Sequence, residues 1–283
     1  MSPKGAPPAS ESTKGLRLTV LGSGTCELRA EASSPAHLVS AGGTHLVMDL
    51  GQGALRRLMQ AGVAPVDLSA VLLTHHHLDH MADLLPLLFA ANYDPAMKER
   101  ARLTLAAHHG LAEVLSSLEV AFDHWLTPTP PVVSPLWLTP GEQFTVGPIT
   151  VACASASHME TSLAYRLTFG SASLVYLGDS EAHPGLVEFC TGASLLLVNC
   201  ASTDEHPKPG HLGARAAGEL AAAAKVGGLL LSHLYSDVDP RQSLASAQEV
   251  YEGPLWLAAD LMRLAIDGSG VCAEGRQGKK SAG

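Results

Sequence analysis

A short apolar run that ends in a cluster of metal-binding side chains constrains this chain more than any other feature. The segment AVLLT (70–74) is followed at once by HHHLDH (75–80). A continuous apolar run is typical of a strand buried on both faces. The histidines and the aspartate therefore follow the end of a buried strand, where the strand fixes the backbone and the loop aims the side chains. The segment predicts a metal site at the edge of a sheet.

The spacing in this loop divides the candidate ligands into two groups. His75 and His77 lie two residues apart, so both can point to one side and offer imidazoles to one metal. Asp79 and His80 turn the other way as a helix begins, and they can serve a second metal or hold a hydroxide. Zinc takes nitrogen and oxygen ligands, and a catalytic site leaves a position for water. The alternative is a solvated surface turn, which four ligands after so apolar a strand disfavour.

Length, charge and cysteine content narrow the class of protein. The 283 residues carry a net charge of −9, which argues against binding long nucleic acid through many phosphate contacts, although a local basic patch is compatible with it. The five cysteines form no CxxC pair, which favours a reducing cytoplasm over a disulfide framework. The first residues lack the apolar region of a signal peptide. No apolar run approaches the roughly eighteen residues of a membrane span.

The chain alternates strands and helices in both halves, which predicts a layered α/β sandwich. Helices are predicted at residues 54–62, 81–93, 111–122, 186–190 and 213–227. Strands are predicted at residues 16–22, 37–51 (two strands around a Gly-Gly turn), 67–75, 103–110, 142–155, 162–170, 173–179, 195–201 and 229–235.

The domain boundaries follow from composition. Residues 1–15 are rich in Pro, Ser, Gly and Ala and are predicted to form a disordered tail. Residues 16–267 are expected to form a single domain, and residues 268–283 a flexible C-terminal tail. The proline-rich stretch 127–135 is predicted to be a connection at the rim of the fold.

The motif HxHxDH at residues 75–80 resembles the signature of the metallo-β-lactamase superfamily, and the resemblance extends over roughly residues 16 to 266. The segments LTVLGSGT, MDLGQGALRRL and LLTHHHLDHMADLLPLL resemble successive blocks of its ribonuclease Z-like branch. The resemblance implies a four-layer αββα sandwich. In this fold two mixed sheets lie face to face, helices cover them outside, and the site lies at one edge between the sheets.

The resemblance also implies the rest of the ligand set. SHMETSLAYRL resembles the block with the third metal histidine, VYLGDS the block with the bridging aspartate, and LLLSHLY the block with the last histidine. It implies a first metal held by His75, His77 and His158, a second held by Asp79, His80 and His233, and Asp179 between them. Zinc suits this set best, and manganese or iron would also fit.

Further residues are predicted around the metals. GHLGARAAGELA resembles the family segment in which a histidine, here His211, donates a proton to the leaving group or steadies the scissile phosphate. The alternative for His211 is a loop residue at a helix start. Asp49 is expected to orient a ligand imidazole, and the turn 22–25 is taken as structural because it lacks the third glycine of nucleotide-binding loops. Spacing assigns no role to His37, His45, His76, His108, His109, His124, His183 and His206.

Two departures from ribonuclease Z restrict the substrate. Asn199 and Cys200 stand where that family carries His-Glu, so a carboxylate that would favour a protonated His211 is missing. Only twenty residues separate His158 from Asp179, which leaves no room for the arm that grips tRNA. We therefore expect a substrate smaller than precursor tRNA.

The leading prediction is a metal-dependent hydrolase acting on a small or cyclic phosphodiester, or on a short oligonucleotide end. The two metals would lower the pKa of a bridging water, and the hydroxide held by both ions and by Asp79 would attack phosphorus. His211 would protonate or hydrogen-bond the departing oxygen. The alternatives are an acyl hydrolase of a lactone, thioester or β-lactam, a ribonuclease Z-type tRNA 3′-processing endonuclease, and a metal-binding protein without catalysis. A homodimer is the default for a soluble oligomer.

Overall fold

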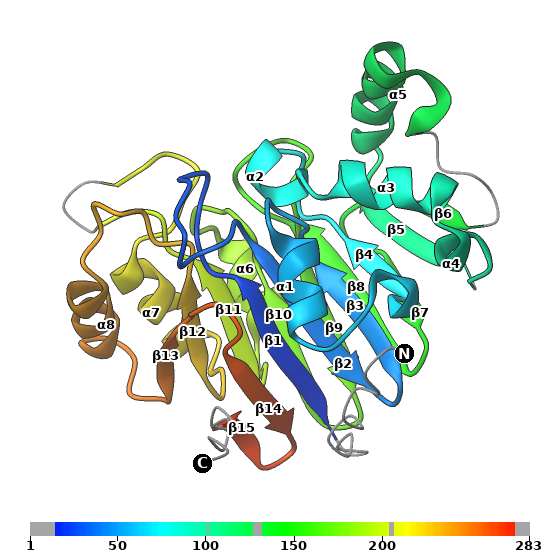
Figure 1. Cartoon of the computed structure of the whole chain (residues 1–283). Helices are drawn as coiled ribbons and strands as arrows, with labels where there is room; N and C mark the ends of the chain where they lie inside the picture. Colours follow the sequence, from blue (N-terminus) through cyan, green and yellow to red (C-terminus); the bar gives the residue numbers. More distant parts are fainter. Residues whose placement is uncertain (1–14, 101, 127–131, 204–206, 275–283) are drawn as a thin grey trace, which may run out of the picture.

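Two β-sheets packed face to face form the centre of the molecule, and helices cover their outer faces (Figure 1). The computed structural model describes residues 15–100, 102–126, 132–203 and 207–274. Buried apolar side chains fill three layers, one between the sheets and one under the helices on each side. The predicted four-layer αββα sandwich is therefore confirmed.

The first sheet has eight strands in the order β15-β14-β1-β2-β3-β4-β5-β6. Strands β3 to β6 are parallel, and the remaining pairs are antiparallel. Its strands are β1 (Leu16–Gly22), β2 (Ala36–Ala41), β3 (Thr44–Met48), β4 (Ala70–Leu72), β5 (Leu103–His108), β6 (Val133–Leu138), β14 (Arg263–Asp267) and β15 (Gly270–Glu274).

The second sheet has seven strands in the order β13-β12-β11-β10-β9-β8-β7. Strands β10 to β13 are parallel, and β7 to β10 are antiparallel. Its strands are β7 (Gln143–Val146), β8 (Ile149–Ser155), β9 (Leu163–Phe169), β10 (Ala172–Tyr176), β11 (Leu195–Asn199), β12 (Leu229–Ser232) and β13 (Leu255–Leu257).

The helices divide between the two outer faces. Those before β6 lie on the side of the first sheet, with α5 projecting from it at the upper right of Figure 1, and those after β10 pack on the second. They are α1 (Ala54–Gln60), α2 (Leu78–Met81), α3 (Leu84–Tyr93), α4 (Pro95–Lys98), α5 (Leu111–Phe122), α6 (Pro184–Cys190), α7 (Ala214–Ala223) and α8 (Pro240–Gln248). None of the helices in the described ranges is both long enough and apolar enough to cross a membrane.

The predicted helix over residues 81–93 is interrupted near its start. Helix α2 ends at Met81, and α3 begins at Leu84. Pro86 consequently falls in the first turn of α3, where its missing N–H costs no helical hydrogen bond. The break lets α2 present its residues at the end of β4 while α3 covers the sheet.

The predicted tails and the proline-rich connection differ in part from the structure. Residues 270–274 form β15, so the prediction of a flexible tail from residue 268 is wrong there. An edge strand paired on one side and half exposed carries little apolar signal, which explains the error. Residues 133–135 of the predicted connection belong instead to β6, whose Pro135 is tolerated because the strand lies at a sheet edge. Residues 1–14, 127–131 and 275–283 lie outside the described residues.

Candidate metal centre

The structure brings all seven predicted ligands together at one edge of the two sheets. His75 and His77 follow β4, and Asp79 and His80 lie on the short helix α2. The remaining three come from loops at strand ends of the second sheet: His158 after β8, Asp179 after β10 and His233 after β12. Each sheet therefore contributes to the cluster, and the strand ends set its backbone.

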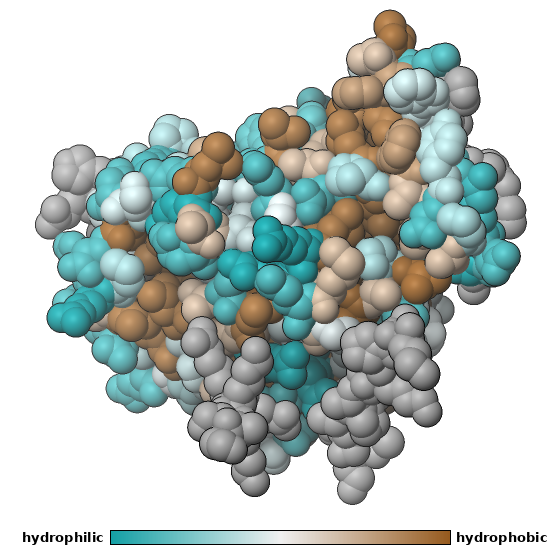
Figure 2. Space-filling view, in the orientation of Figure 1, coloured by the Kyte–Doolittle hydropathy of each residue, from teal (hydrophilic) through white to brown (hydrophobic). Residues whose placement is uncertain are grey.

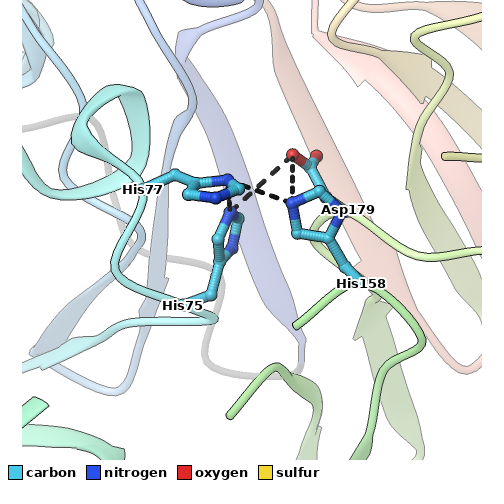
Figure 3. Close-up of side chains that lie close together, drawn as sticks. All are labelled: His75, His77, His158 and Asp179. Carbon is cyan, nitrogen blue, oxygen red and sulfur yellow. Dashed lines mark hydrogen bonds and ion pairs between the residues drawn. The ribbon is translucent and has the colours of Figure 1, made fainter. Parts of the chain in front are cut away.

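One group consists of His75, His77, His158 and Asp179, which point toward one another in Figure 3. Nδ1 of His77 lies 3.1 Å from Nε2 of His75 and 3.0 Å from Nε2 of His158. Oδ2 of Asp179 lies 3.8 Å from Nε2 of His75 and 3.8 Å from Nε2 of His158. Three ring nitrogens and one carboxylate oxygen thus face a common point and could hold one metal ion.

A second group consists of Asp79, His80 and His233. Oδ2 of Asp79 lies 3.8 Å from Nε2 of His80 and 3.4 Å from Nε2 of His233. Asp179 also reaches this group, because its Oδ2 lies 3.2 Å from Nε2 of His80 and its Oδ1 lies 3.9 Å from Nε2 of His233. Asp179 is therefore shared by both groups, as a bridging carboxylate would be.

The unsatisfied nitrogen of His80 supports a metal at the second group. The His80 side chain is fully buried, yet its Nε2 makes no hydrogen bond to any described residue, although Asp179 lies close to it. A buried polar atom without a partner costs about 1–3 kcal/mol. A divalent ion bound to Nε2 would remove that cost, so the residues of the second group fit a metal ion.

A buried carboxylate, Asp49, fixes the other nitrogen of His80. Oδ2 of Asp49 accepts a hydrogen bond from Nδ1 of His80 at 2.8 Å and another from the hydroxyl of Tyr176 at 2.7 Å. Its Oδ1 accepts from the backbone N–H of Thr74 at 2.7 Å and from the Thr74 hydroxyl at 2.9 Å. Asp49 therefore fixes the orientation of the His80 imidazole.

A backbone carbonyl fixes His158 in the same way. Nδ1 of His158 donates to the carbonyl oxygen of Gly210 at 2.9 Å, and the N–H of Gly210 donates to Oε1 of Glu181 at 2.6 Å. Gly210 has a φ of +79°, and a Cβ there would collide with Nδ1 of His158. Sequence reasoning missed both Gly210 and Glu181. The only signals were the positions of Gly210 beside His211 and of Glu181 two residues after Asp179.

Burial and neighbouring charges shift the pKa values of the cluster in opposite directions. Burial disfavours the charged form of His80, but Asp179 and Asp49 outweigh it and raise its pKa well above the usual value. Burial lowers the pKa of His75 well below its usual value, and His80 adds to the effect. Burial disfavours the carboxylate of Asp179, yet His233 and His80 lower its pKa well below the usual range. The cluster thus keeps its shared carboxylate ionised, as metal binding requires.

His211 lies beside the cluster, near the carboxylate of Asp179. Its Nδ1 is 3.8 Å from Oδ2 of Asp179 and makes no hydrogen bond to the described residues. Burial lowers its pKa to about 4, and the attraction of Asp179 only partly opposes this. Asn199 is directed elsewhere: its Nδ2 donates to Oδ1 of Asp179 at 2.9 Å. The imidazole of His211 is therefore neutral at pH 7.

Comparison with known proteins agrees with this geometry. A family profile described as a β-lactamase superfamily domain matches residues 46–234, which hold all seven predicted ligands. The chain belongs to the metallo-β-lactamase superfamily. Its similarity to ribonuclease Z proteins and to another metallo-hydrolase places it in the ribonuclease Z-like branch, and the hydrolase class follows from this membership.

Two relatives, one of them also compared through its crystal structure, illustrate the match. The chain is 28% identical over 275 residues to ribonuclease Z from Mycobacterium bovis, covering 89% of this chain and 98% of that protein. It is 30% identical over 223 residues to the probable metallo-hydrolase YhfI from Bacillus subtilis, covering 77% of this chain and 87% of that protein. The crystal structure of YhfI superposes with a TM-score of 0.78 and 27% identity, covering 88% and 98% of the two chains.

Proposed function

We propose that this hydrolase is a phosphodiesterase that acts on a small or cyclic phosphodiester. The observation that carries the proposal is the position of Nδ1 of His211. This nitrogen is buried, makes no hydrogen bond to the described residues, and lies 3.8 Å from the carboxylate shared by the two ligand groups. The departing alkoxide oxygen of an alkyl phosphodiester needs a donor at such a place, whereas the thiolate that leaves a thioester does not.

The ligand groups and His211 would divide the chemistry between them. Two divalent metals, for which we propose zinc, would act as Lewis acids and lower the pKa of water. Asp79 would accept a hydrogen bond from the attacking water and orient it. Neutral His211 would donate a hydrogen bond to the departing oxygen. Because its pKa is about 4 before substrate binds, we propose stabilisation of that oxygen rather than full proton transfer.

The short connection between β9 and β10 supports a small substrate. The strands are joined through Gly170 and Ser171 alone, with Phe169 paired directly to Ala172. The segment that would hold a tRNA-gripping arm is therefore a tight turn. The net charge of −9 also disfavours a long polyanion.

A second candidate, a ribonuclease Z-type endonuclease, is favoured by the similarity to the Mycobacterium bovis protein over nearly its whole length. One panel separates the candidates. Protein of measured metal content is given bis(p-nitrophenyl) phosphate, cyclic nucleotides, a precursor tRNA, a lactone and a thioester. We expect turnover of the small phosphodiesters and little of the others. Cleavage of the tRNA alone would favour the second candidate, and no phosphodiester turnover with full metal loading would refute both.

The role of His211 is tested by His211→Ala, with the exposed His109→Ala as the matched control. We expect His211→Ala to lower kcat for a cyclic nucleotide, which has an alkoxide leaving group, by roughly 100-fold or more, with a smaller change in KM. His109→Ala should behave as the wild type. Equal loss of phosphodiester and ester turnover in His211→Ala would contradict the assignment.

A further inference from the structure

A polar cavity lies between helix α1 and the loop that follows β1, apart from the metal cluster. Its volume is about 530 Å³, the size range of sites that hold nucleotide-sized ligands. Strongly hydrophilic residues gather over α1 on the face of the molecule drawn in Figure 2. Polar lining residues of the cavity include Arg29, Ser33, Gln52, Arg56, Arg57 and Gln60.

The cavity concentrates positive charge in an otherwise acidic protein. Three arginines and one acidic residue, Glu27, line it, against a net charge of −9 for the chain. Glu27 is already engaged, because its carboxylate accepts hydrogen bonds from the N–H and the hydroxyl of Ser236 at 2.7 and 2.8 Å. The lining therefore offers an excess of guanidinium groups to a bound anion.

The three arginines differ in how far the protein satisfies them. Arg57 is engaged within the protein, because its Nε donates to Oδ2 of Asp260 at 2.9 Å and to Oγ of Ser33 at 3.2 Å. Arg56 is exposed and makes no ion pair or hydrogen bond within the described ranges. Nε of Arg29 makes no hydrogen bond among the same residues and lies 3.9 Å from Oε1 of the exposed Glu31, while its Nη2 donates to the carbonyl oxygen of Leu234 at 3.4 Å. Arg56 thus retains all of its donors for a ligand, and Arg29 retains those that these contacts leave free.

The wall of the cavity adjoins the metal cluster through Gly51. A Cβ at Gly51 would collide with the carbonyl oxygen of Asp79 on one side and would crowd the side chain of Ser34 on the other. Ser34 lines the cavity, and Asp79 belongs to the second ligand group. One glycine therefore lies between Ser34, which lines the cavity, and Asp79 of the second ligand group.

We propose that this cavity is a second anion site, which binds a phosphate group of a nucleotide-sized ligand through Arg29 and Arg56. Guanidinium groups match the oxygens of phosphate in charge and geometry. The amides of Gln52 and Gln60 offer hydrogen bonds to the polar remainder of such a ligand. The phosphate belongs either to the far end of the substrate or to a separate nucleotide.

Residue-resolved arginine labelling tests the site without any turnover, and so independently of the proposed phosphodiesterase activity. Metal-loaded protein is treated with phenylglyoxal at increasing concentrations of AMP, and each modified arginine is quantified by mass spectrometry. We expect AMP to protect Arg29 and Arg56 but not Arg241 on α8. In Arg56→Gln, half-maximal protection of Arg29 should need roughly tenfold more AMP than in the wild type. In Arg241→Gln, the AMP concentration that protects Arg29 should be the same as in the wild type. Unprotected Arg29 and Arg56, or equal protection curves in both variants, would overturn the proposal.

Two chromogenic substrates then assign the source of the phosphate. Thymidine 5′-(p-nitrophenyl phosphate) is compared with the same compound carrying an added 3′-phosphate. If the site holds the far end of the substrate, Arg56→Gln raises KM only for the doubly phosphorylated compound. If it holds a separate nucleotide, both KM values stay unchanged while AMP still protects the wild type. Either result supports the anion site once protection has been seen.

Discussion

The carboxylate of Asp49 accepts a hydrogen bond from Nδ1 of His80 at 2.8 Å, and both side chains are fully buried. Asp49 also has a left-handed backbone, with a φ of 55°, which a non-glycine residue adopts only where the surroundings enforce it. This pair sets the direction in which His80 presents Nε2 to the second ligand group. We therefore expect the second metal to depend on a residue that does not contact it.

The variant Asp49→Asn tests this dependence. The amide keeps the size of the side chain but loses the charge that holds the His80 ring, so metal affinity should fall by roughly 10- to 100-fold. Competition with a chelator, followed by elemental analysis, measures the change. Asp67→Asn, which changes an exposed carboxylate at the end of a short helix over residues 65–67, is the control and should bind metal as the wild type does. Unchanged affinity in Asp49→Asn would show that His80 is held by packing alone.

Removal of the metals should destabilise the whole fold, because the ligands come from both sheets. At a free metal concentration of 100 times Kd, binding contributes about 2.7 kcal/mol to stability. Chelation should then lower Tm by roughly 5–10 °C. In Asp179→Asn, which weakens both ligand groups, the same treatment should shift Tm much less. Thermal unfolding with and without chelator measures this, and equal shifts in the two proteins would refute the shared role of Asp179.

Gly210 should be indispensable for the position of His158. Gly210→Ala places a Cβ against Nδ1 of His158 and also strains a backbone at a φ of +79°. The matched control is Gly192→Ala, whose φ is +66° but whose Cβ would meet no atom within 4 Å. Both variants should lose stability of about 1 kcal/mol, and only Gly210→Ala should also lose metal and activity. Identical metal content in the two would argue against the contact.

His37 should make the protein sensitive to acid. Its side chain is fully buried, neither ring nitrogen has a hydrogen-bond partner among the described residues, and burial lowers its pKa to about 3. Because this native pKa lies below that of the unfolded chain, His37 costs no stability above about pH 6.5. As the pH falls from 6.5 toward 3, His37 becomes protonated in the unfolded state but stays neutral in the native state. Stability then falls by up to roughly 1.4 kcal/mol per pH unit from this group.

The variant His37→Phe isolates this contribution. It keeps an aromatic ring against Tyr176 and removes the titrating group. Urea unfolding from pH 7 to pH 4, with chelator present in all samples, should show a shallower loss of stability in the variant. The exposed His109→Phe should follow the wild type. Parallel curves for His37→Phe and the wild type would mean that His37 is protonated in the native state.

The sequence predicted those parts of the site that depend on local spacing or on family blocks. The loop from His75 to His80 could be recognised because four candidate ligands directly follow a strongly apolar strand. His158, Asp179 and His233 came from resemblance, since distant residues carry no spacing signal of their own. The hydrogen bond to the carbonyl of Gly210 could not be predicted, because every residue has a backbone carbonyl and the residue type does not show which one is used. The side-chain bond from Asn199 to Asp179 depends on the pairing of β10 with β11 and needed the structure.

The same division applies to the fold. Strand β4 was predictable because burial on both faces makes it apolar throughout, and β1 because its sequence alternates and ends in glycine. Strand β15 was not, since it pairs on one side only and its pattern of exposure is mostly open to solvent. The three arginines around the cavity are likewise scattered between a loop and a helix, so that only their assembly in space reveals the charge.

The turn at Gly170 and Ser171 lies at the end of β9 and β10 that points away from the ligands, because the other end of β9 is hydrogen-bonded to Thr74 beside His75. A change of length there would leave every ligand in place. The length of this hairpin is consequently independent of the geometry of the ligand cluster. In a lineage built on this scaffold, a single hairpin could grow or shrink while all seven predicted ligands are inherited intact.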